Sequence, residues 1–301
     1  MQYSRLGKTD LTVSSIGMGC VTFGREISEQ ASFQVLDHAL ERGITLFDTA
    51  EAYAAGESER VLGNWVSQRG VRDRIVLATK VSGTLTRERV IGSAEESLTR
   101  LQTETIDLFQ LHCWDASTPL EETVAALNEL VTSGKVRWVG CSNWTAAQLG
   151  MALEMAGASG AARMESVQPP YNLVQREIEA DLLPLCAAHD VGVISYSPLA
   201  AGFLTGKYRR GGDVPKGTRF DVIPGHQPIY FTDHGFGILD RLGRVAKEAG
   251  QSMISLSLAW VLSRARVTSV LIGARNSGHI DQAFDAAALE VDEATLQRLT
   301  N

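Results

Sequence analysis

The segment at 47–57, FDTAEAYAAGE, places Asp48 and Tyr53 five positions apart, directly after a short apolar run. Lys80 and His112 follow at even intervals, because Asp48, Lys80 and His112 are separated by 32 residues each. A carboxylate, a phenol, a primary amine and an imidazole are all groups that transfer or stabilise a proton. Their even spacing indicates that one site holds all of them.

Proton donation to a substrate oxygen is the chemistry that these residues suggest. A tyrosine phenol has a pKa of about 10, and lowering it to about 7 takes roughly 4 kcal/mol of preferential phenolate stabilisation. We expect the Lys80 ammonium group to supply that stabilisation, while Asp48 keeps Lys80 charged and oriented. His112 would donate a hydrogen bond to a carbonyl oxygen, and Tyr53 would be the acid.

Eight short apolar runs alternate with amphipathic segments and are the candidate strands. They are IGMGC at 16–20, TLFDT at 45–49, IVLATK at 75–80, IDLFQLH at 106–112, VRWVGCSN at 136–143, ESVQPPYN at 165–172, VGVISYSPL at 191–199 and VTSVLIGA at 267–274. Helical patterns lie between them, for example at 32–42, 58–67, 87–101 and 119–133. Strand then helix, repeated in this way, predicts a (β/α)8 barrel.

A doubly wound sheet is the rival fold, and its GxGxxG fingerprint should follow the first strand. The segment at that place is GMGCVTFG at 17–24, in which the third glycine lies outside the position that the fingerprint requires. In a barrel, Asp48, Lys80 and His112 all stand at strand ends on the C-terminal face, where this fold carries its chemistry. Singly, each could be a cap, a surface lysine or a core histidine, and Tyr53 a half-buried ring. Their common level favours a site.

Two segments depart from the strand and helix repeat. Residues 3–6 and 11–13, joined by a turn at 7–10, predict an N-terminal β-hairpin. Residues 201–237 form a Gly- and Pro-rich excursion after the seventh strand, of the kind that serves as a lid or binding loop, or else a disordered insertion. Its six aromatic residues argue against full disorder. With no separable linker, we expect residues 1–301 to form a single domain.

Composition narrows the possible partners. The chain has 301 residues, 44% hydrophobic content and a net charge of −7, which argues against nucleic-acid and anionic-membrane partners. The N-terminus MQYSRLGKTD lacks the apolar segment of a signal peptide, and no window is long enough to span a membrane. The cysteines show neither disulfide nor metal-ligand spacing, so we expect a cytoplasmic protein with no metal. They are Cys20, Cys113, Cys141 and Cys186.

Over almost its full length the chain resembles the aldo-keto reductases. The matching motifs are FDTAEAYAAGESERVLG at 47–63, LATK at 77–80, DLFQLH at 107–112, GCSN at 140–143, SVQPPYN at 166–172, YSPLAAGFLTGKY at 196–208 and IGAR at 272–275. The resemblance implies that Asp48, Tyr53, Lys80 and His112 are the catalytic residues. The ketosteroid double-bond reductases of this family have glutamate at the histidine position, so His112 points to carbonyl reduction.

The resemblance also implies NADP(H) as the cofactor, bound across the barrel mouth without a Rossmann domain. Ser142, Asn143 and Gln168 match the positions that hold the nicotinamide carboxamide, and Tyr196 matches the ring that stacks on the nicotinamide. Residues matching the pyrophosphate loop are Ser197, Leu199, Gly202, Leu204, Gly206 and Lys207. Each of these polar or apolar positions could equally serve strand-end hydrogen bonding or core packing.

The phosphate and adenine end departs from the family pattern. In the segment GARNSGHIDQA at 273–283, His279 replaces a glutamine, and Gln282 and Ala283 replace a final Glu-Asn pair. Gly273, Arg275, His279 and Gln282 are the residues expected there, with Arg275 reading the 2′-phosphate. The expected substrate wall is also aromatic. Its candidates are Phe23, Trp114 and Trp144, with Tyr230 or Phe231.

The sequence therefore predicts an NADPH-dependent reductase that converts an aldehyde or ketone to an alcohol. One alternative is a Schiff-base aldolase or lyase with Lys80 as the nucleophile. Another is a cofactor-binding sensor with little turnover, like the potassium-channel β subunits of the family. The expected partner is a small carbonyl compound, and neither its identity nor the oligomeric state follows from the sequence.

Overall fold

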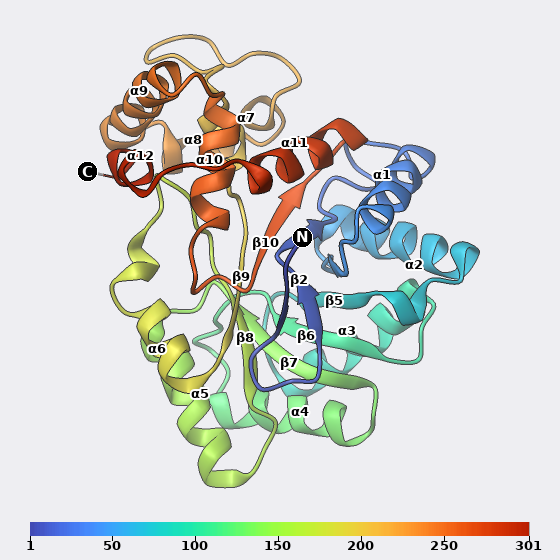
Figure 1. The fold of residues 1–301 in the computed structure, drawn as a ribbon. Coiled ribbons are helices and arrows are strands. Elements are labelled where there is room, and N and C mark those ends of the chain that lie inside the picture. Colours follow the sequence, from blue (N-terminus) through green and yellow to red (C-terminus); the bar gives the residue numbers. More distant parts are fainter. Residues whose placement is uncertain (301) are drawn as a thin grey trace.

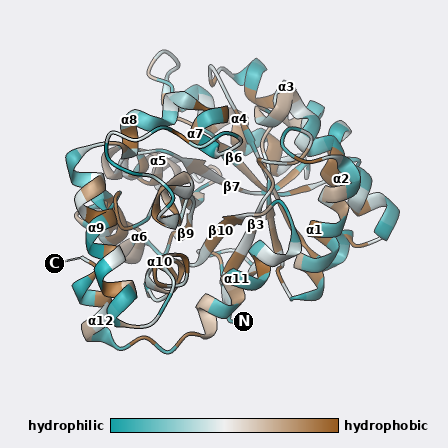
Figure 2. Ribbon diagram, turned by 90° about the horizontal axis from the view of Figure 1, so that it is seen from above, coloured by the Kyte–Doolittle hydropathy of each residue, from teal (hydrophilic) through white to brown (hydrophobic). Residues whose placement is uncertain are grey.

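The computed structural model describes residues 1–300 and contains a closed barrel of parallel strands inside a layer of helices (Figures 1 and 2). The strand order around the barrel is β10-β3-β4-β5-β6-β7-β8-β9. The strands are β3 (Ile16–Gly19), β4 (Leu46–Asp48), β5 (Val76–Val81), β6 (Ile106–Leu111), β7 (Val136–Ser142), β8 (Met164–Gln168), β9 (Gly192–Ser195) and β10 (Ser269–Gly273). All predicted strands are present, and the (β/α)8 barrel is confirmed.

Helices cover the outside of the barrel, with hydrophobic colour concentrated on the strands in Figure 2. They are α1 (Glu29–Glu41), α2 (Glu57–Arg69), α3 (Arg87–Leu101), α4 (Leu120–Thr132), α5 (Ala146–Ser159), α6 (Leu182–His189), α9 (Asp233–Glu248), α10 (Met253–Leu262), α11 (Ser277–Ala288) and α12 (Glu293–Arg298). α1 begins before the predicted Ser32, because the Ser28 hydroxyl accepts from the N–H of Ala31 and caps it. Within residues 1–300 no helix is long and apolar enough to cross a bilayer.

The N-terminal hairpin closes the bottom of the barrel. β1 (Tyr3–Arg5) and β2 (Thr12–Ser14) pair antiparallel, as predicted. Side chains of the hairpin pack with inward-facing residues of the strands in one buried apolar cluster. The cluster consists of Leu6, Leu11, Val13, Leu46, Val76, Ala78, Leu108, Ile194 and Leu271. Water is thereby excluded from the N-terminal end of the barrel interior.

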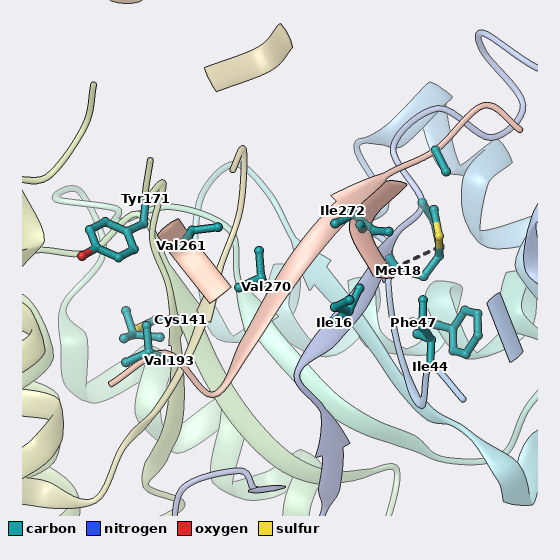
Figure 3. Close-up of a cluster of buried hydrophobic side chains, with 14 of the residues drawn as sticks. Ile16, Met18, Ile44, Phe47, Cys141, Tyr171, Val193, Val261, Val270 and Ile272 are labelled. Atoms are coloured by element: carbon teal, nitrogen blue, oxygen red, sulfur yellow. Dashed lines mark hydrogen bonds between the residues drawn. The ribbon is translucent and has the colours of Figure 1, made fainter. Parts of the chain in front are cut away.

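A second, larger apolar cluster lies between the strands and the helices. Figure 3 shows Ile16 and Met18 of β3 beside Val270 and Ile272 of β10. The two strands are paired in register, with Ile16 opposite Val270 and Met18 opposite Ile272. Successive residues of a strand alternate between this outer cluster and the barrel interior. The alternation decides which side chains can reach the mouth.

The excursion after β9 is an ordered cap, which differs from the predicted loop at 201–237. It contains η4 (Ala200–Thr205), α7 (Arg219–Val222), η5 (Pro224–His226) and α8 (Gln227–Tyr230), and α9 already begins at Asp233. Its aromatic rings pack on one another, with centroids 5.1–6.2 Å apart, so they order the segment as expected. The rings belong to Phe203, Tyr208, Phe220, Tyr230, Phe231 and Phe236.

Close packing of α2 on α3 yields a test of the barrel wall. A Cβ at Gly63 would lie 2.5 Å from the backbone oxygen of Arg100 and 2.7 Å from the backbone carbon of Leu101. We expect Gly63→Ala to lower the free energy of unfolding by about 1–3 kcal/mol, because one of the helices must shift. The control is Gly150→Ala in α5, where a Cβ meets nothing within 4 Å.

The control should instead raise the free energy of unfolding by about 0.5–1 kcal/mol, as alanine does in an open helix position. Urea unfolding of the two variants measures both changes. Equal stabilisation by both substitutions would show that α2 and α3 do not meet at Gly63.

Candidate active site

A buried ion pair stands at the centre of the barrel mouth. Nζ of Lys80 donates to Oδ1 of Asp48 and, over 2.7 Å, to the backbone oxygen of Thr49. Asp48 and Lys80 are 1% and 0% exposed. The other carboxylate oxygen of Asp48 accepts from Nε2 of Gln110 at 3.0 Å and from Nε2 of Gln168 at 2.9 Å. Both charges are therefore paired and hydrogen-bonded, which a buried pair requires.

Strand register brings these residues together from distant parts of the sequence. Asp48 is the last residue of β4, and it pairs with Ala78 of β5, two positions before Lys80. Lys80 in turn pairs with Gln110 of β6. Residues two apart on a strand point to the same side, so Lys80 lies directly above Ala78 of the apolar floor. The predicted proximity of Asp48 and Lys80 is confirmed.

Tyr53 reaches the ion pair from the loop after β4. Its Oη lies 3.4 Å from Nζ of Lys80, and its ring centroid lies 5.0 Å from the same atom. The chain turns sharply beyond it, since Ala54 and Ala55 have φ of 50° and 54° and Gly56 has φ of 85°. Left-handed alanines cost about 1–2 kcal/mol each, so the surrounding structure enforces this turn.

Burial, more than the neighbouring charges, sets the protonation state of the Tyr53 phenol, which differs from our expectation. Burial raises the pKa of Tyr53 above its usual 10, and the Lys80 cation only partly offsets this effect. Burial also opposes the charge on Lys80, but Asp48 and Tyr53 outweigh it and raise the pKa of Lys80. The prediction of a phenol pKa near 7 is wrong, because burial disfavours the phenolate more than the Lys80 cation stabilises it, and the Asp48 charge adds to the effect of burial. Tyr53 is protonated at neutral pH.

His112 follows β6 and completes the cluster. Its backbone N–H donates to the oxygen of Val81 over 2.9 Å, and its Nδ1 lies 2.9 Å from Oγ of Ser82. Its ring meets the Tyr53 ring edge-on, with centroids 5.7 Å apart. Burial and the charge of Lys80 lower the pKa of His112 to about 4. The imidazole is therefore neutral at neutral pH, with one N–H donor and one acceptor nitrogen.

The residues expected at the nicotinamide lie beside His112. Asn143 has φ of 60°, and its Nδ2 donates to the backbone oxygen of His112 over 2.9 Å. The hydroxyl of Tyr196 donates to Oδ1 of Asn143 over 2.8 Å. Ser142 is buried and donates to the backbone oxygen of Gln168 over 2.7 Å. The amide of Gln168 also donates to Asp48, so Gln168 stabilises the ion pair as well.

The expected pyrophosphate and phosphate residues surround one side of the mouth. Ser197 has a positive φ of 55°, and Gly202 and Gly206 have φ of 89° and 82°, so this loop turns tightly. Lys207 is exposed, whereas Leu204 is fully buried and Leu199 partly buried. The side chain of Leu204 therefore belongs to the core, and only its backbone remains for a ligand.

Arg275 leaves β10 just before α11, as expected. Its Nη1 donates to the backbone oxygen of Gly217 over 3.4 Å, and its own N–H donates to Nδ1 of His279 over 3.3 Å. Burial and the nearby charge of Arg275 lower the pKa of Lys207. Burial, Arg275 and Lys207 together lower the pKa of His279. Gly273 and Gln282 are exposed on the same segment.

Some of the aromatic residues expected to contact the substrate lie at the barrel mouth, and others are buried in the core. Trp114 is partly exposed and packs edge-on against Trp144, with ring centroids 4.8 Å apart. Trp144 is 3% exposed, and its indole N–H has no partner within residues 1–300. Phe23 is fully buried, and Tyr230 is 4% exposed. Trp114 and the partly exposed Phe231 are the candidates whose side chains reach solvent.

Sequence reasoning missed three residues that support the site. Gln110 is buried and donates to Asp48. Its position two residues before His112, on the inward face of β6, is the sequence feature that could have identified it. Ser82 contacts His112, and its backbone N–H donates to Glu51 over 2.7 Å. No motif spacing distinguishes Ser82 or Glu51 from ordinary loop residues.

A parallel barrel with ionisable residues at the C-terminal ends of its strands is the architecture of a (β/α)8-barrel enzyme. The model of the Aldo/keto reductase family matches residues 15–301. The chain belongs to the aldo/keto reductase family. It is therefore an NADP-dependent oxidoreductase acting on carbonyl compounds and alcohols.

Similar curated proteins carry related names. The chain is 33% identical to a "Probable voltage-gated potassium channel subunit beta" of Arabidopsis thaliana, over 95% of this chain and 91% of the relative. It is 33% identical to "Aldo-keto reductase YhdN" of Bacillus subtilis, over 93% and 87% respectively. It is 31% identical to "Protein tas" of Escherichia coli, over 99% and 96%.

The neutrality of His112 can be measured directly. We expect its imidazole to titrate near pH 4 in an NMR titration, instead of the usual value of about 6.5. The unfolded protein would bind this proton first, so part of the stability is lost as pH falls from about 6.5 toward 4. Lys80→Met should raise the midpoint, because it removes the nearby cation. A midpoint near 6.5 in the wild type would contradict this electrostatic description.

Proposed function

We propose that the protein reduces an aldehyde or ketone to an alcohol, with the proton coming from Tyr53. When bound, NADPH supplies the hydride to the carbonyl carbon. The observation that carries the proposal is the contact of Lys80 with both Asp48 and Oη of Tyr53, beside a neutral His112. A substrate oxygen between the phenol and the imidazole would meet two uncharged hydrogen-bond donors.

Each residue has a separate part in this proposal. Tyr53 holds its proton until negative charge develops on the substrate oxygen, and then releases it. Lys80 stabilises the resulting phenolate, and Asp48 keeps the ammonium group charged in a buried position. His112 donates a hydrogen bond that orients the carbonyl and stabilises its developing charge. Reversing these roles gives alcohol oxidation.

The residues present fit NADP(H). Arg275 lies close enough to Lys207 and His279 to lower the pKa of both groups, and Lys207 also lowers the pKa of His279. A phosphate anion would offset this repulsion between positive charges. α11 begins at Ser277, so its unpaired N–H groups add to an anion-binding end. At the other end, the partly exposed Tyr196 ring is fixed by its hydrogen bond to Asn143 and can support a flat heterocycle.

The structure disfavours the Schiff-base alternative. A nucleophilic lysine needs a neutral amine, which enzymes obtain by desolvation or by a neighbouring cation. Lys80 instead lies against Asp48, which raises its pKa, and the side chain is fully buried. Its three ammonium donors are all in use, on Asp48, Thr49 and Tyr53.

A cofactor-sensing subunit is the second candidate, favoured by the similarity to proteins named as potassium channel β subunits. A panel of aldehydes and ketones, followed by NADPH absorbance, separates the two candidates. Turnover of a carbonyl supports the reductase. Tight NADPH binding with no turnover on the whole panel would favour the sensor.

Tyr53→Phe tests the acid. We expect the reduction rate to fall by at least about 10²-fold, because general acid catalysis is lost. The dissociation constant for NADPH should stay within a few fold, since the cofactor lies mainly on other residues. Stopped-flow turnover and fluorescence titration measure the two quantities. Ordinary turnover in the variant would remove Tyr53 from this role.

Arg275→Ala tests the coenzyme preference. A charged hydrogen bond is worth about 1.5–3 kcal/mol, so we expect NADPH binding to weaken by roughly 10- to 150-fold while NADH binding stays nearly unchanged. Arg74→Ala is a matched control, because Arg74 is the exposed last residue of η2 (Arg72–Arg74) and lies far from the cationic cluster in sequence. Equal losses for the two coenzymes would show that Arg275 does not read the 2′-phosphate.

A further inference from the structure

Ser82, in the loop after β5, forms a direct contact to the imidazole of His112. Its Oγ lies 2.9 Å from Nδ1, and within residues 1–300 it has no other hydrogen-bond partner. Nε2 of His112 likewise has no partner in this part of the chain. The ring is therefore held through one nitrogen only, and the other is left for a ligand at the mouth.

The backbone of Ser82 is itself fixed by a carboxylate from the neighbouring loop. Its N–H donates to Oε1 of Glu51 over 2.7 Å. The Glu51 side chain is 9% exposed, pairs with Arg89, and accepts from Oγ of Ser93 over 2.6 Å. Because Glu51 is anchored on α3 through these two residues, Ser82 has a defined position relative to His112.

The protonation pattern of His112 then matters for any carbonyl ligand. A neutral imidazole carries one N–H donor and one acceptor nitrogen, and its other hydrogen bond decides which is which. If Nδ1–H donated to Ser82, Nε2 would present a lone pair to the mouth, and a carbonyl oxygen would meet an acceptor. If the hydroxyl donates to Nδ1, Nε2 carries the hydrogen and can bind that oxygen.

We propose that Ser82 is a positioning residue, whose hydroxyl donates to Nδ1 of His112 and holds the imidazole in the Nε2–H tautomer that a substrate carbonyl requires. This inference rests on the proposed carbonyl reduction for its purpose. The geometry itself comes from the contacts of Ser82, Glu51 and His112. His112 touches the substrate, and Ser82 acts only through His112.

The tautomer can be observed without turnover. In protein labelled with ¹⁵N-histidine, long-range ¹⁵N–¹H correlation spectra distinguish a protonated ring nitrogen from an unprotonated one, and loss of signals in His112→Gln assigns the resonances. At pH 7 we expect a protonated Nε2 and an unprotonated Nδ1 in the wild type. A wild-type ring with its hydrogen on Nδ1 would overturn the proposal.

Ser82→Ala tests the role of the hydroxyl. The ring nitrogens should shift toward a mixture of tautomers, and kcat should fall by about 10-fold, because the substrate oxygen loses its donor in much of the population. NADPH affinity should change less than twofold. Ser82→Thr retains the hydroxyl and should restore both the spectrum and most of kcat. An unchanged tautomer in Ser82→Ala contradicts the inference.

A control variant removes a serine hydroxyl in another part of the chain. Ser257 lies in α10, and its Oγ donates only to Met253 of the same helix, over 2.8 Å. Ser257→Ala should leave the His112 spectrum and kcat at wild-type values. A comparable loss of kcat in Ser82→Ala and Ser257→Ala would show that Ser82 has only a structural role. If the wild type turns over no carbonyl, the reductase proposal fails, whereas the spectra still decide whether Ser82 sets the tautomer.

Discussion

The ion pair of Asp48 and Lys80 is the interaction on which the rest of the site depends. A buried pair of charges is tolerated only when its members are in contact and their remaining hydrogen-bonding capacity is filled. The barrel meets that requirement with side chains from several strands, since Gln110 and Gln168 bind the carboxylate and the backbone of Thr49 binds the ammonium group. The ion pair therefore has all its hydrogen-bond partners only when these strands are assembled in the closed barrel.

The apolar floor below the pair keeps its electrostatics strong. The hairpin seals the N-terminal end, so bulk water reaches the charges only from the mouth, where Tyr53 and His112 lie. Interactions between charges grow as water is excluded, which explains why Lys80 lowers the pKa of His112 without a direct contact. The floor therefore affects the chemistry although none of its residues contacts a ligand.

The fold and the main catalytic positions could be predicted because they follow from periodicity. Strands ending at regular intervals bring Asp48 and Lys80 together at the mouth, and the structure shows their contact. The pKa of Tyr53 could not be predicted, since it depends on how strongly burial disfavours the phenolate against the effects of the Lys80 and Asp48 charges, and the spacing of residues in the sequence contains neither burial nor distances. Ser82 was missed for a similar reason, because its contact to His112 joins two loops with no local pattern.

A protonated phenol and a neutral imidazole make the timing of proton transfer depend on the substrate. Neither group can protonate a free carbonyl oxygen appreciably, because Tyr53 has a pKa above 10 and His112 carries no charge near neutrality. An alcohol is a weaker acid than a phenol, so transfer becomes favourable only as the oxygen acquires alkoxide character. Lys80 then acts on the product of the transfer, the phenolate, and need not lower the resting pKa to neutrality.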